Sequence, residues 1–132
     1  AQSPTFTPTL PGTHTFLLTV DDGLGGTDTV SVTVAVQNQN PFADAGPDQT
    51  VPAGTREVQL AGSASGGCGS YVFDWAIQAL PAGSTTSSSD IHDPGDPDAL
   101  LMIDAAGSYV LSLQAYDGAS WSTPDLVVID AE

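Results

Sequence analysis

The chain has 132 residues, of which 16 are acidic and only Arg56 is basic, so its formal net charge is −15. Nucleic acids and anionic lipids recruit proteins through Lys and Arg, and this composition therefore excludes both as expected partners. Hydrophobic residues make up 40 %, enough for a core, and no stretch approaches the ~18 apolar residues of a membrane helix. Because the chain has a single Lys or Arg, it has almost no trypsin-type cleavage sites, which favours an extracellular or cell-surface location.

The first predicted element is a β-hairpin. Residues 14–20 place His14, Phe16, Leu18 and Val20 on one face of a strand, and residues 29–36 place four valines on one face of the next. A glycine-rich turn separates the two strands. The polar run 37–41, which ends in a proline, is interpreted as a linker between two units.

A second series of strands follows the linker. Six short alternating segments are separated by turn residues, namely Asp48–Val51, Arg56–Ala61, Tyr71–Ile77, Leu100–Ile103, Tyr109–Tyr116 and Leu126–Ile129. An immunoglobulin-like sandwich needs about seven strands, and a short edge strand within residues 80–91 would supply the missing one. We therefore predict an all-β, immunoglobulin-like sandwich over residues 40–132.

An internal repeat determines the predicted organisation. The correspondences are Gly12 with Gly107, Phe16 with Leu111, Leu18 with Leu113, and Asp22-Gly23 with Asp117-Gly118. Residues 1–39 are thus predicted to be the C-terminal half of a unit, plus linker, whose complete form is residues 40–132. A half sandwich exposes a core face and an open edge.

Three interpretations of the half unit stay open at this stage. The chain is a fragment of a longer repeat array, a neighbouring molecule supplies the missing strands, or the first 39 residues wrap in a way that the pattern does not reveal. The second interpretation describes a subunit that assembles by strand addition into an extracellular filament or surface layer.

The motifs resemble those of PKD (polycystic-kidney-disease-type) repeats. The run from Asn40 to Val51 is similar to the opening strand of that family, and the later motifs follow in the family's order: Gly62-Ser63-Ala64-Ser65, Trp75, Pro81-Ala82-Gly83-Ser84, Ala106-Gly107-Ser108-Tyr109 and Asp117-Gly118. The Pro81–Ser84 run and residues 3–8 resemble the egg-jelly-receptor-like branch of bacterial or archaeal surface proteins. The resemblance covers residues 40–132 and, through the repeat, residues 1–39.

The resemblance implies a seven-stranded sandwich that occurs in tandem in secreted or surface proteins. It implies no enzymatic activity, contacts with proteins or glycans, and, in some members, calcium near the domain junction. The loop Gly66–Ser70 departs from the family because it lacks the Asp-x-Asp-Gly that many members carry there.

Catalytic motifs are absent from the sequence. There is no Gly-x-Ser-x-Gly elbow, His-Glu-x-x-His helix or phosphate-binding loop. His14 lies on the apolar side of its strand, and His92 lies in an Asp-Pro-Gly loop. We therefore predict that the protein is not an enzyme.

Calcium is the predicted ligand with the clearest chemistry. The start of the first strand and the last hairpin loop lie at one end of an immunoglobulin-like sandwich, which would bring together Asn40, Asp44, Asp117 and Asp125. Ca²⁺ prefers carboxylate and carbonyl oxygens. The alternative is turn chemistry, because Asp-Gly forms hairpin loops and Asp caps turns.

Two further side chains have predicted roles. Trp121 follows the Asp-Gly loop and is the candidate contact residue for a glycan or a protein. Cys68, the only cysteine, is either a buried small side chain or a partner in an intermolecular disulfide.

The predicted function is that of a non-catalytic, extracellular structural or adhesive repeat, whose partners are neighbouring repeats, other copies of the protein, or a glycan or protein ligand. The alternatives are the self-assembling filament or surface-layer subunit and, with less support, a carbohydrate-binding accessory module.

Overall fold

The computed structural model describes residues 3–37 and 39–132, which form two compact units. Unit 1 is Ala1–Gln39 and unit 2 is Asn40–Glu132. Residues 1 and 2, and Asn38 of the predicted linker, lie outside the described residues. Among the described residues, the one helical segment is a short 3-10 turn, and no helix has the length and apolar character needed to cross a membrane.

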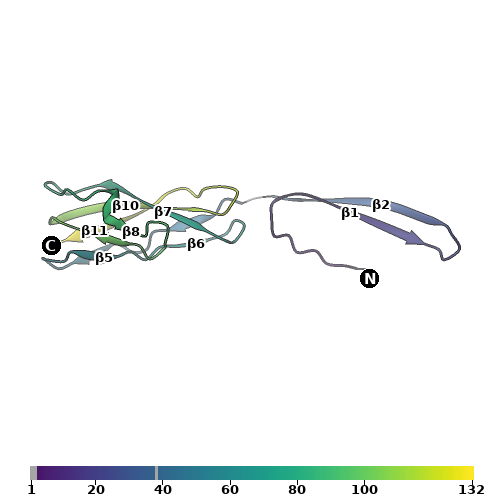
Figure 1. Ribbon diagram of the computed structural model, residues 1–132, viewed down its shortest axis with the longest axis horizontal. Helices are drawn as coiled ribbons and strands as arrows, with labels where there is room; N and C mark the ends of the chain where they lie inside the picture. The colour runs from purple at the N-terminus through teal and green to yellow at the C-terminus, as the bar shows by residue number, and fades with distance from the viewer. Residues whose placement is uncertain (1–2, 38) are drawn as a thin grey trace. The chain divides into compact units, whose positions relative to one another are not determined.

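Unit 1 is built on a long antiparallel hairpin of β1 (Gly12–Asp21) and β2 (Thr27–Val36) (Figure 1). Residues directly opposite each other in an antiparallel pair share a face. Phe16 faces Val32 and Leu18 faces Val30, so one face is apolar. The opposite face is mostly threonine and serine, which makes the hairpin strongly two-sided.

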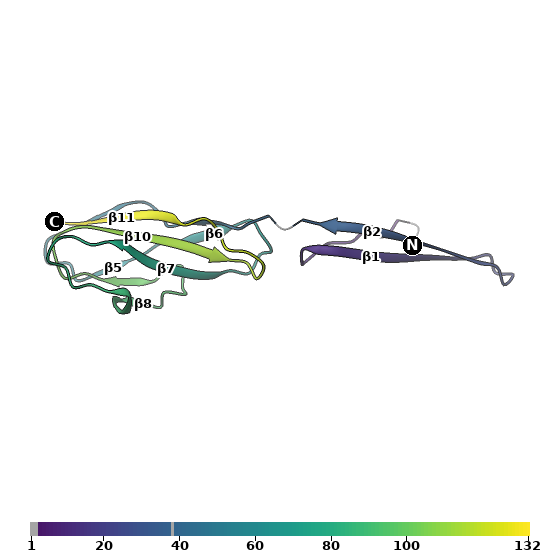
Figure 2. The same cartoon turned by 90° about the horizontal axis from the view of Figure 1, so that it is seen from above.

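Unit 2 is a two-layer β-sandwich, which Figure 2 shows from above. Its strands are β3 (Phe42–Asp44), β4 (Gln49–Val51), β5 (Glu57–Gln59), β6 (Ser63–Ser65), β7 (Val72–Ala79), β8 (Ile91–His92), β9 (Leu100–Met102), β10 (Gly107–Tyr116) and β11 (Asp125–Ala131). One layer is the four-stranded sheet β4-β11-β10-β7. The other contains the pair β3-β6 and the three-stranded sheet β5-β9-β8.

The opening strand is divided between the two layers. β3 pairs with β6, whereas β4 runs parallel to β11 in the other sheet. The division occurs at Gly46, which has φ +83°, and a Cβ there would lie 2.4 Å from the carbonyl oxygen of Ala61. Only glycine therefore allows the chain to cross between the layers at this point.

Two other strands differ in detail from the sequence prediction. The strand predicted over Arg56–Ala61 is confined to β5, and the separate strand β6 follows it. The edge strand expected within residues 80–91 is β8, which begins at the end of that range, directly after the 3-10 turn Ser88–Asp90. If β3 and β4 are counted as one interrupted strand, and β5 and β6 as another, the number of strands in unit 2 agrees with the seven of an immunoglobulin-like sandwich.

The core lies between the two layers of unit 2. Its largest fully buried side chains are Tyr109, Leu60, Leu101, Leu111, Leu113, Ile129 and Val127. Trp75 of β7 is also buried, and its indole N–H donates to the carbonyl of Asp96 at 3.0 Å. Within the described residues, no buried side-chain polar atom lacks a hydrogen-bond partner, as a well-formed core requires.

Asp104 connects the loop before β8 to the corner before β10. Its carboxylate accepts hydrogen bonds from the Ser84 and Thr86 hydroxyls and from both the amide and the hydroxyl of Thr85. These bonds favour the ionised form, so the hydrogen bond from Ser84, followed by those from Thr85, holds the pKa of Asp104 well below its usual range.

A depressed pKa in the folded state predicts acid sensitivity. The stabilisation is present above the ordinary aspartate pKa of 3.8 and is lost as the pH falls towards the lower folded-state pKa. We expect Asp104→Asn to lower the thermal unfolding midpoint at pH 7, and the difference from wild type to shrink as the pH falls below about 4. Calorimetry across this range measures the effect, and a difference that is independent of pH would contradict the assignment.

Candidate functional site

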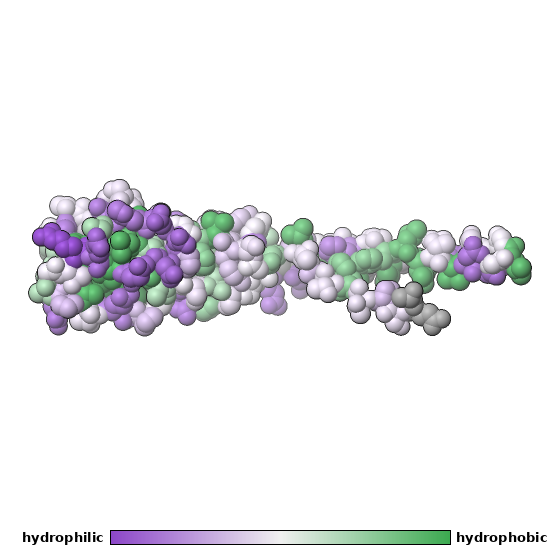
Figure 3. Space-filling view, turned by 60° about the horizontal axis from the view of Figure 1, so that its bottom comes forward, coloured by the Kyte–Doolittle hydropathy of each residue, from purple (hydrophilic) through white to green (hydrophobic). Residues whose placement is uncertain are grey.

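The most unusual surface of the protein is the apolar side of the β1–β2 hairpin. We call it the hairpin face; it consists of Phe16, Leu18, Val20, Val30, Val32 and Val34. The exposed fraction of these side chains runs from 37 % for Phe16 to 60 % for Val30. Figure 3 shows hydrophobic residues gathered along the hairpin. Contiguous exposed apolar surface of this kind marks interaction sites in soluble proteins.

The side chain of Phe6, from the segment before β1, packs against the hairpin face. Its ring centroid is 4.8 Å from that of Phe16, in an edge-on arrangement, and 5.1 Å from the His14 ring. Together with Pro4 and Thr5, it borders a hollow of about 680 Å³ whose remaining lining comes from the two strands. Residues 4–6 thus cover the part of the hairpin face around Phe16, and the rest of that face is open.

The same hairpin occurs in unit 2, where it is β10–β11. In unit 1 the cross-strand pairs are Gly12 with Val36, His14 with Val34, Phe16 with Val32 and Leu18 with Val30. The corresponding pairs in unit 2 are, in the same order, Gly107 with Ala131, Tyr109 with Ile129, Leu111 with Val127 and Leu113 with Asp125. One constant offset in residue number relates all of these pairs. Residues 12–36 and 107–131 therefore correspond without a gap, turn included.

The turns of the two hairpins share their hydrogen bonding. Oδ1 of Asp22 accepts from the amides of Leu24 at 2.8 Å and Gly26 at 2.9 Å. Oδ1 of Asp117 likewise accepts from two amides in its turn, those of Ala119 and Ser120. The pKa of each aspartate is lowered chiefly by these bonds, from Leu24 in the first turn and from Ser120 in the second.

The starts of the two hairpins also correspond. The hydroxyl of Tyr109 donates to the carbonyl of Ala105 at 2.9 Å, which is the tyrosine corner of immunoglobulin-like folds. At the equivalent position, Nε2 of His14 donates to the carbonyl of Leu10 at 3.1 Å. His14 therefore has a structural partner that corresponds to that of a core tyrosine.

The two hairpins differ in what covers them. In unit 2, β7 pairs with the outer edge of β10, and Leu111, Leu113 and Ala115 are fully buried. Pro81 lies against Gly107, where a Cβ would be 2.6 Å from the proline Cβ. In unit 1, a Cβ on Gly12 would have no neighbour within 4 Å, and within residues 3–37 and 39–132 β1 pairs only with β2.

The residues predicted to hold calcium divide into two places. Asp125 accepts from the amide of Ala45 at 2.8 Å, and Asp44 accepts at 2.9 Å from the amide of Gly46, two residues further along the chain. Asp117 is buried and accepts from the amide of Cys68 at 3.0 Å. The carbonyl of Asn40 lies beside Gly66, in the same loop as Cys68.

These contacts show that the carboxylate of each of the three predicted aspartates already accepts a hydrogen bond from a backbone amide. In the part of the chain that the structure describes, no three His, Cys, Asp or Glu side chains form a group that could hold a metal ion. Calcium binding through Asn40, Asp44, Asp117 and Asp125 stays a prediction.

Trp121 is 46 % exposed and lies on Tyr116, with the ring centroids 5.1 Å apart. A glycan or protein contact at this residue stays a prediction. Cys68 is half-buried, and burial, followed by the negative charge of Asp117, raises the pKa of its thiol. A raised thiol pKa lowers its reactivity at neutral pH.

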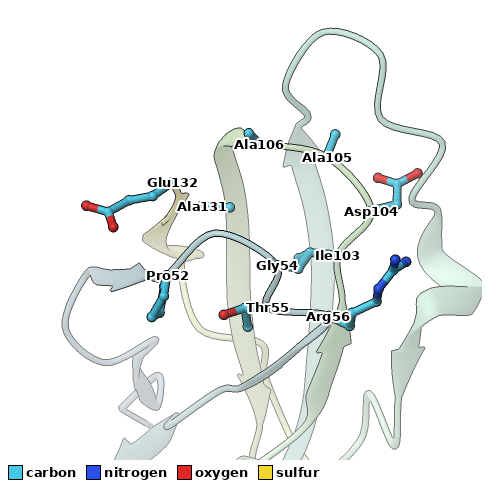
Figure 4. A pocket seen from close by; sticks show the side chains of 10 residues that line it. All are labelled: Pro52, Gly54, Thr55, Arg56, Ile103, Asp104, Ala105, Ala106, Ala131 and Glu132. Carbon is cyan, nitrogen blue, oxygen red and sulfur yellow. The ribbon is translucent and has the colours of Figure 1, made fainter.

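A smaller, polar hollow of about 160 Å³ lies at the end of unit 2 where the chain leaves it. Figure 4 shows Arg56 and Asp104 on one side of this hollow and Glu132 on the other. The hollow is small, and the carboxylate of Asp104, which lines it, already accepts hydrogen bonds from Ser84, Thr85 and Thr86.

Sequence reasoning found the hairpin face but missed the full extent of the repeat. The constant offset reaches back to Phe6, which corresponds to the buried Leu101 of β9. If the alignment of Asp22-Gly23 with Asp117-Gly118 is extended in both directions without gaps, it reveals the match of Phe6 with Leu101. Comparison of the residues would also have shown that Val30 stands where unit 2 has Asp125.

Comparison with known proteins supports the fold. No protein-family model and no curated protein matches the chain. The PKD domain from the KIAA 1837 protein is similar in structure, with a TM-score of 0.56 at 20 % identity, over 74 % of this chain and 92 % of that domain. The PKD domain from human KIAA0319 has a TM-score of 0.58 at 14 % identity, over 72 % and 83 %. The predicted PKD-type, immunoglobulin-like sandwich fold is confirmed.

Proposed function

We propose that unit 2 is a non-catalytic, extracellular spacer: a closed structural module that holds the segments before and after it apart. The proposal rests on the path of the chain. β4, in the opening part of the unit, runs parallel to the last strand, β11, and pairs with it through Gln49–Val51 and Ile129–Ala131. The chain therefore enters the unit at one end and leaves at the other, as Figure 1 shows.

This path sets how the unit resists tension. A pull on the two ends loads the β4–β11 hydrogen bonds in shear, so several bonds have to break together. The amide of Glu132 donates to the carbonyl of Val51 and adds a bond at the end of this ladder. A module that transmits tension without a large conformational change is suited to a chain of repeats at a cell surface.

The test compares two pulling directions on the same folded unit. We expect unit 2 to unfold in one event when pulled between Asn40 and Glu132, at a clearly higher force than when pulled between Ser108 and Asp130. The latter residues are directly paired across β10 and β11, so their separation breaks the ladder one pair at a time. Equal forces in the two directions would remove the physical basis for a spacer.

A further inference from the structure

Two aromatic side chains and a valine lie side by side on the outer face of the four-stranded sheet of unit 2. Tyr116 of β10 is directly opposite Val72 of β7 on one side, and it forms a bridge with Trp121 on the other. Ala115 is fully buried, so Tyr116, the next residue in the strand, points away from the core. We call Val72, Tyr116 and Trp121 the outer row.

The polar atoms of the two rings in the outer row make no hydrogen bond within the part of the chain that the structure describes. The other tyrosines and the other tryptophan all donate to a backbone carbonyl: Tyr71 to Gly66, Trp75 to Asp96 and Tyr109 to Ala105. The indole N–H of Trp121 and the hydroxyl of Tyr116 are therefore free to bond a ligand, next to apolar ring surface.

The backbone on both sides of Trp121 is held by hydrogen bonds. The amide of Ser122 donates to the carbonyl of Ala115 at 2.8 Å, and the hydroxyl of Ser122 accepts from the amide of Ala115 at 2.9 Å. Before Trp121, the carboxylate of Asp117 accepts from the amide of Ser120 at 2.8 Å. A surface that is already ordered loses little conformational entropy when it binds a ligand.

The internal repeat shows that the turn does not need the aromatic pair for its own formation. The constant offset between the two hairpins places Asp21 at the position of Tyr116 and Gly26 at that of Trp121. The hairpin of unit 1 nevertheless has a turn with the same kind of aspartate hydrogen bonds. The pair is thus an exposed aromatic surface that the shared hairpin structure does not account for.

We propose that the outer row binds a neutral polysaccharide whose sugar rings stack on Trp121 and Tyr116. A pyranose ring has an apolar C–H face and hydroxyl groups around its rim, so it can cover an aromatic ring and form hydrogen bonds beside it. The ring centroids of Trp121 and Tyr116 are 5.1 Å apart, with 34° between the ring planes. The two rings therefore offer adjacent, slightly rotated surfaces to one extended chain.

The charge of the protein selects a neutral sugar. The chain has 16 acidic residues, and its one basic residue, Arg56, directly precedes β5 in the opposite layer. An anionic sugar would be repelled and would find no cation at the outer row. The next position along the sheet holds Asp74 opposite Gln114. The Asp74 carboxylate has no hydrogen-bond partner among the described residues, and it can accept from sugar hydroxyls.

The width of the apolar surface favours a polysaccharide over a protein. The outer row is one side chain deep along its strands, because the polar residues Asp74 and Gln114 follow it. A stable protein interface covers about 800 Å² on each partner and has an apolar centre. A narrow row beside polar groups suits a thin chain instead. The binding is separate from the spacer role, because it uses no residue of the β4–β11 ladder.

Titration of the full chain with soluble linear hexasaccharides of glucose, mannose and N-acetylglucosamine tests the proposal. NMR follows the indole N–H signals of the buried Trp75 and the exposed Trp121. We expect at least one of these sugars to shift the Trp121 signal saturably and to leave the Trp75 signal in place. Absence of a saturable Trp121 shift with all three would overturn the proposal. A hexasaccharide of galacturonic acid that binds as tightly as the neutral sugars would contradict the stated charge preference.

A second exposed aromatic residue of unit 2 gives a matched control. Trp121→Ala should weaken binding about tenfold, equal to about 1.4 kcal/mol. Phe42 is 64 % exposed on β3, in the other layer, and Phe42→Ala should leave the affinity unchanged. Tyr116→Phe, which removes only the hydroxyl, should cause a smaller loss than Trp121→Ala. Calorimetric titration measures all three, and equal effects of the two alanine variants would place the sugar elsewhere and overturn the proposal.

The same spectra separate a failure of the site from a failure of the spacer unit. A Trp75 signal at its wild-type position shows that unit 2 is folded in a variant, so a loss of binding then belongs to the outer row. A Trp121 signal that moves with protein concentration, and with none of the sugars, would identify a second copy of the chain as the occupant and overturn the stated ligand.

Discussion

Leu113→Ala should lower the free energy of unfolding of unit 2 by about 2–5 kcal/mol, the usual cost of a large-to-small change in a core. Leu113 is fully buried, and its Cδ2 lies so close to Gly62 that a Cβ there would be only 2.5 Å away. A cavity at this position has no neighbour that can easily fill it. Urea unfolding of the full chain measures the change through a lower midpoint at an unchanged slope.

Leu18→Ala is the matched control because Leu18 is the counterpart of Leu113 in the repeat. Its side chain is 57 % exposed, so the same chemical change should leave the unfolding of unit 2 within about 0.5 kcal/mol of wild type. A comparable loss of unit 2 stability from both substitutions would contradict the exposed position of Leu18 in a separate unit.

Alternation and turn residues were sufficient to predict most of the fold. The long strands β1, β2, β7 and β10 were found because their apolar residues recur at every second position over many residues. Short strands carry too few residues for a clear period. β6, for example, is Ser63–Ser65, and its pairing with β3 depends on contacts between residues distant in sequence.

The candidate site was predictable in kind but not in detail. The repeat of Gly12, Phe16 and Leu18 identified a half sandwich, and an apolar strand face without a cover follows directly from it. The calcium prediction relied on several aspartates sharing one end of the sandwich. Sequence did not reveal that the Asp125 and Asp117 carboxylates accept hydrogen bonds from distant backbone amides, because such bonds depend on three-dimensional loop positions.

Acidity and apolar surface are distributed in complementary ways in this protein. The net charge of −15 disfavours contact between copies through their general surface. Asp28, opposite Val20, places one carboxylate at the turn end of the hairpin face, and Asp21 and Asp22 lie in and beside the turn. If the hairpin face binds a partner, the three aspartates near the turn favour one with few acidic residues there.

Gly107→Ala should destabilise unit 2 for two separable reasons. The residue has φ +122°, a region that costs a side chain about 1–3 kcal/mol, and the new Cβ would lie 2.6 Å from that of Pro81, an overpacking that adds about 1–3 kcal/mol. Gly83→Ala separates the two terms, since Gly83 has φ +88° but no atom within 4 Å of an added Cβ. Thermal or urea unfolding of both variants gives the difference.

A double-mutant cycle tests the contact itself. Pro81→Gly removes the atom that an alanine at position 107 would meet, so Gly107→Ala should cost less in that background, by about the overpacking term. Equal costs in the two backgrounds would mean that backbone conformation alone requires the glycine. The result bears on unit 1, where Gly12 has the same conformation and an open space beside it. If contact with Pro81 is what Gly107 accommodates, Gly12 keeps the same backbone conformation without an equivalent neighbour among the described residues.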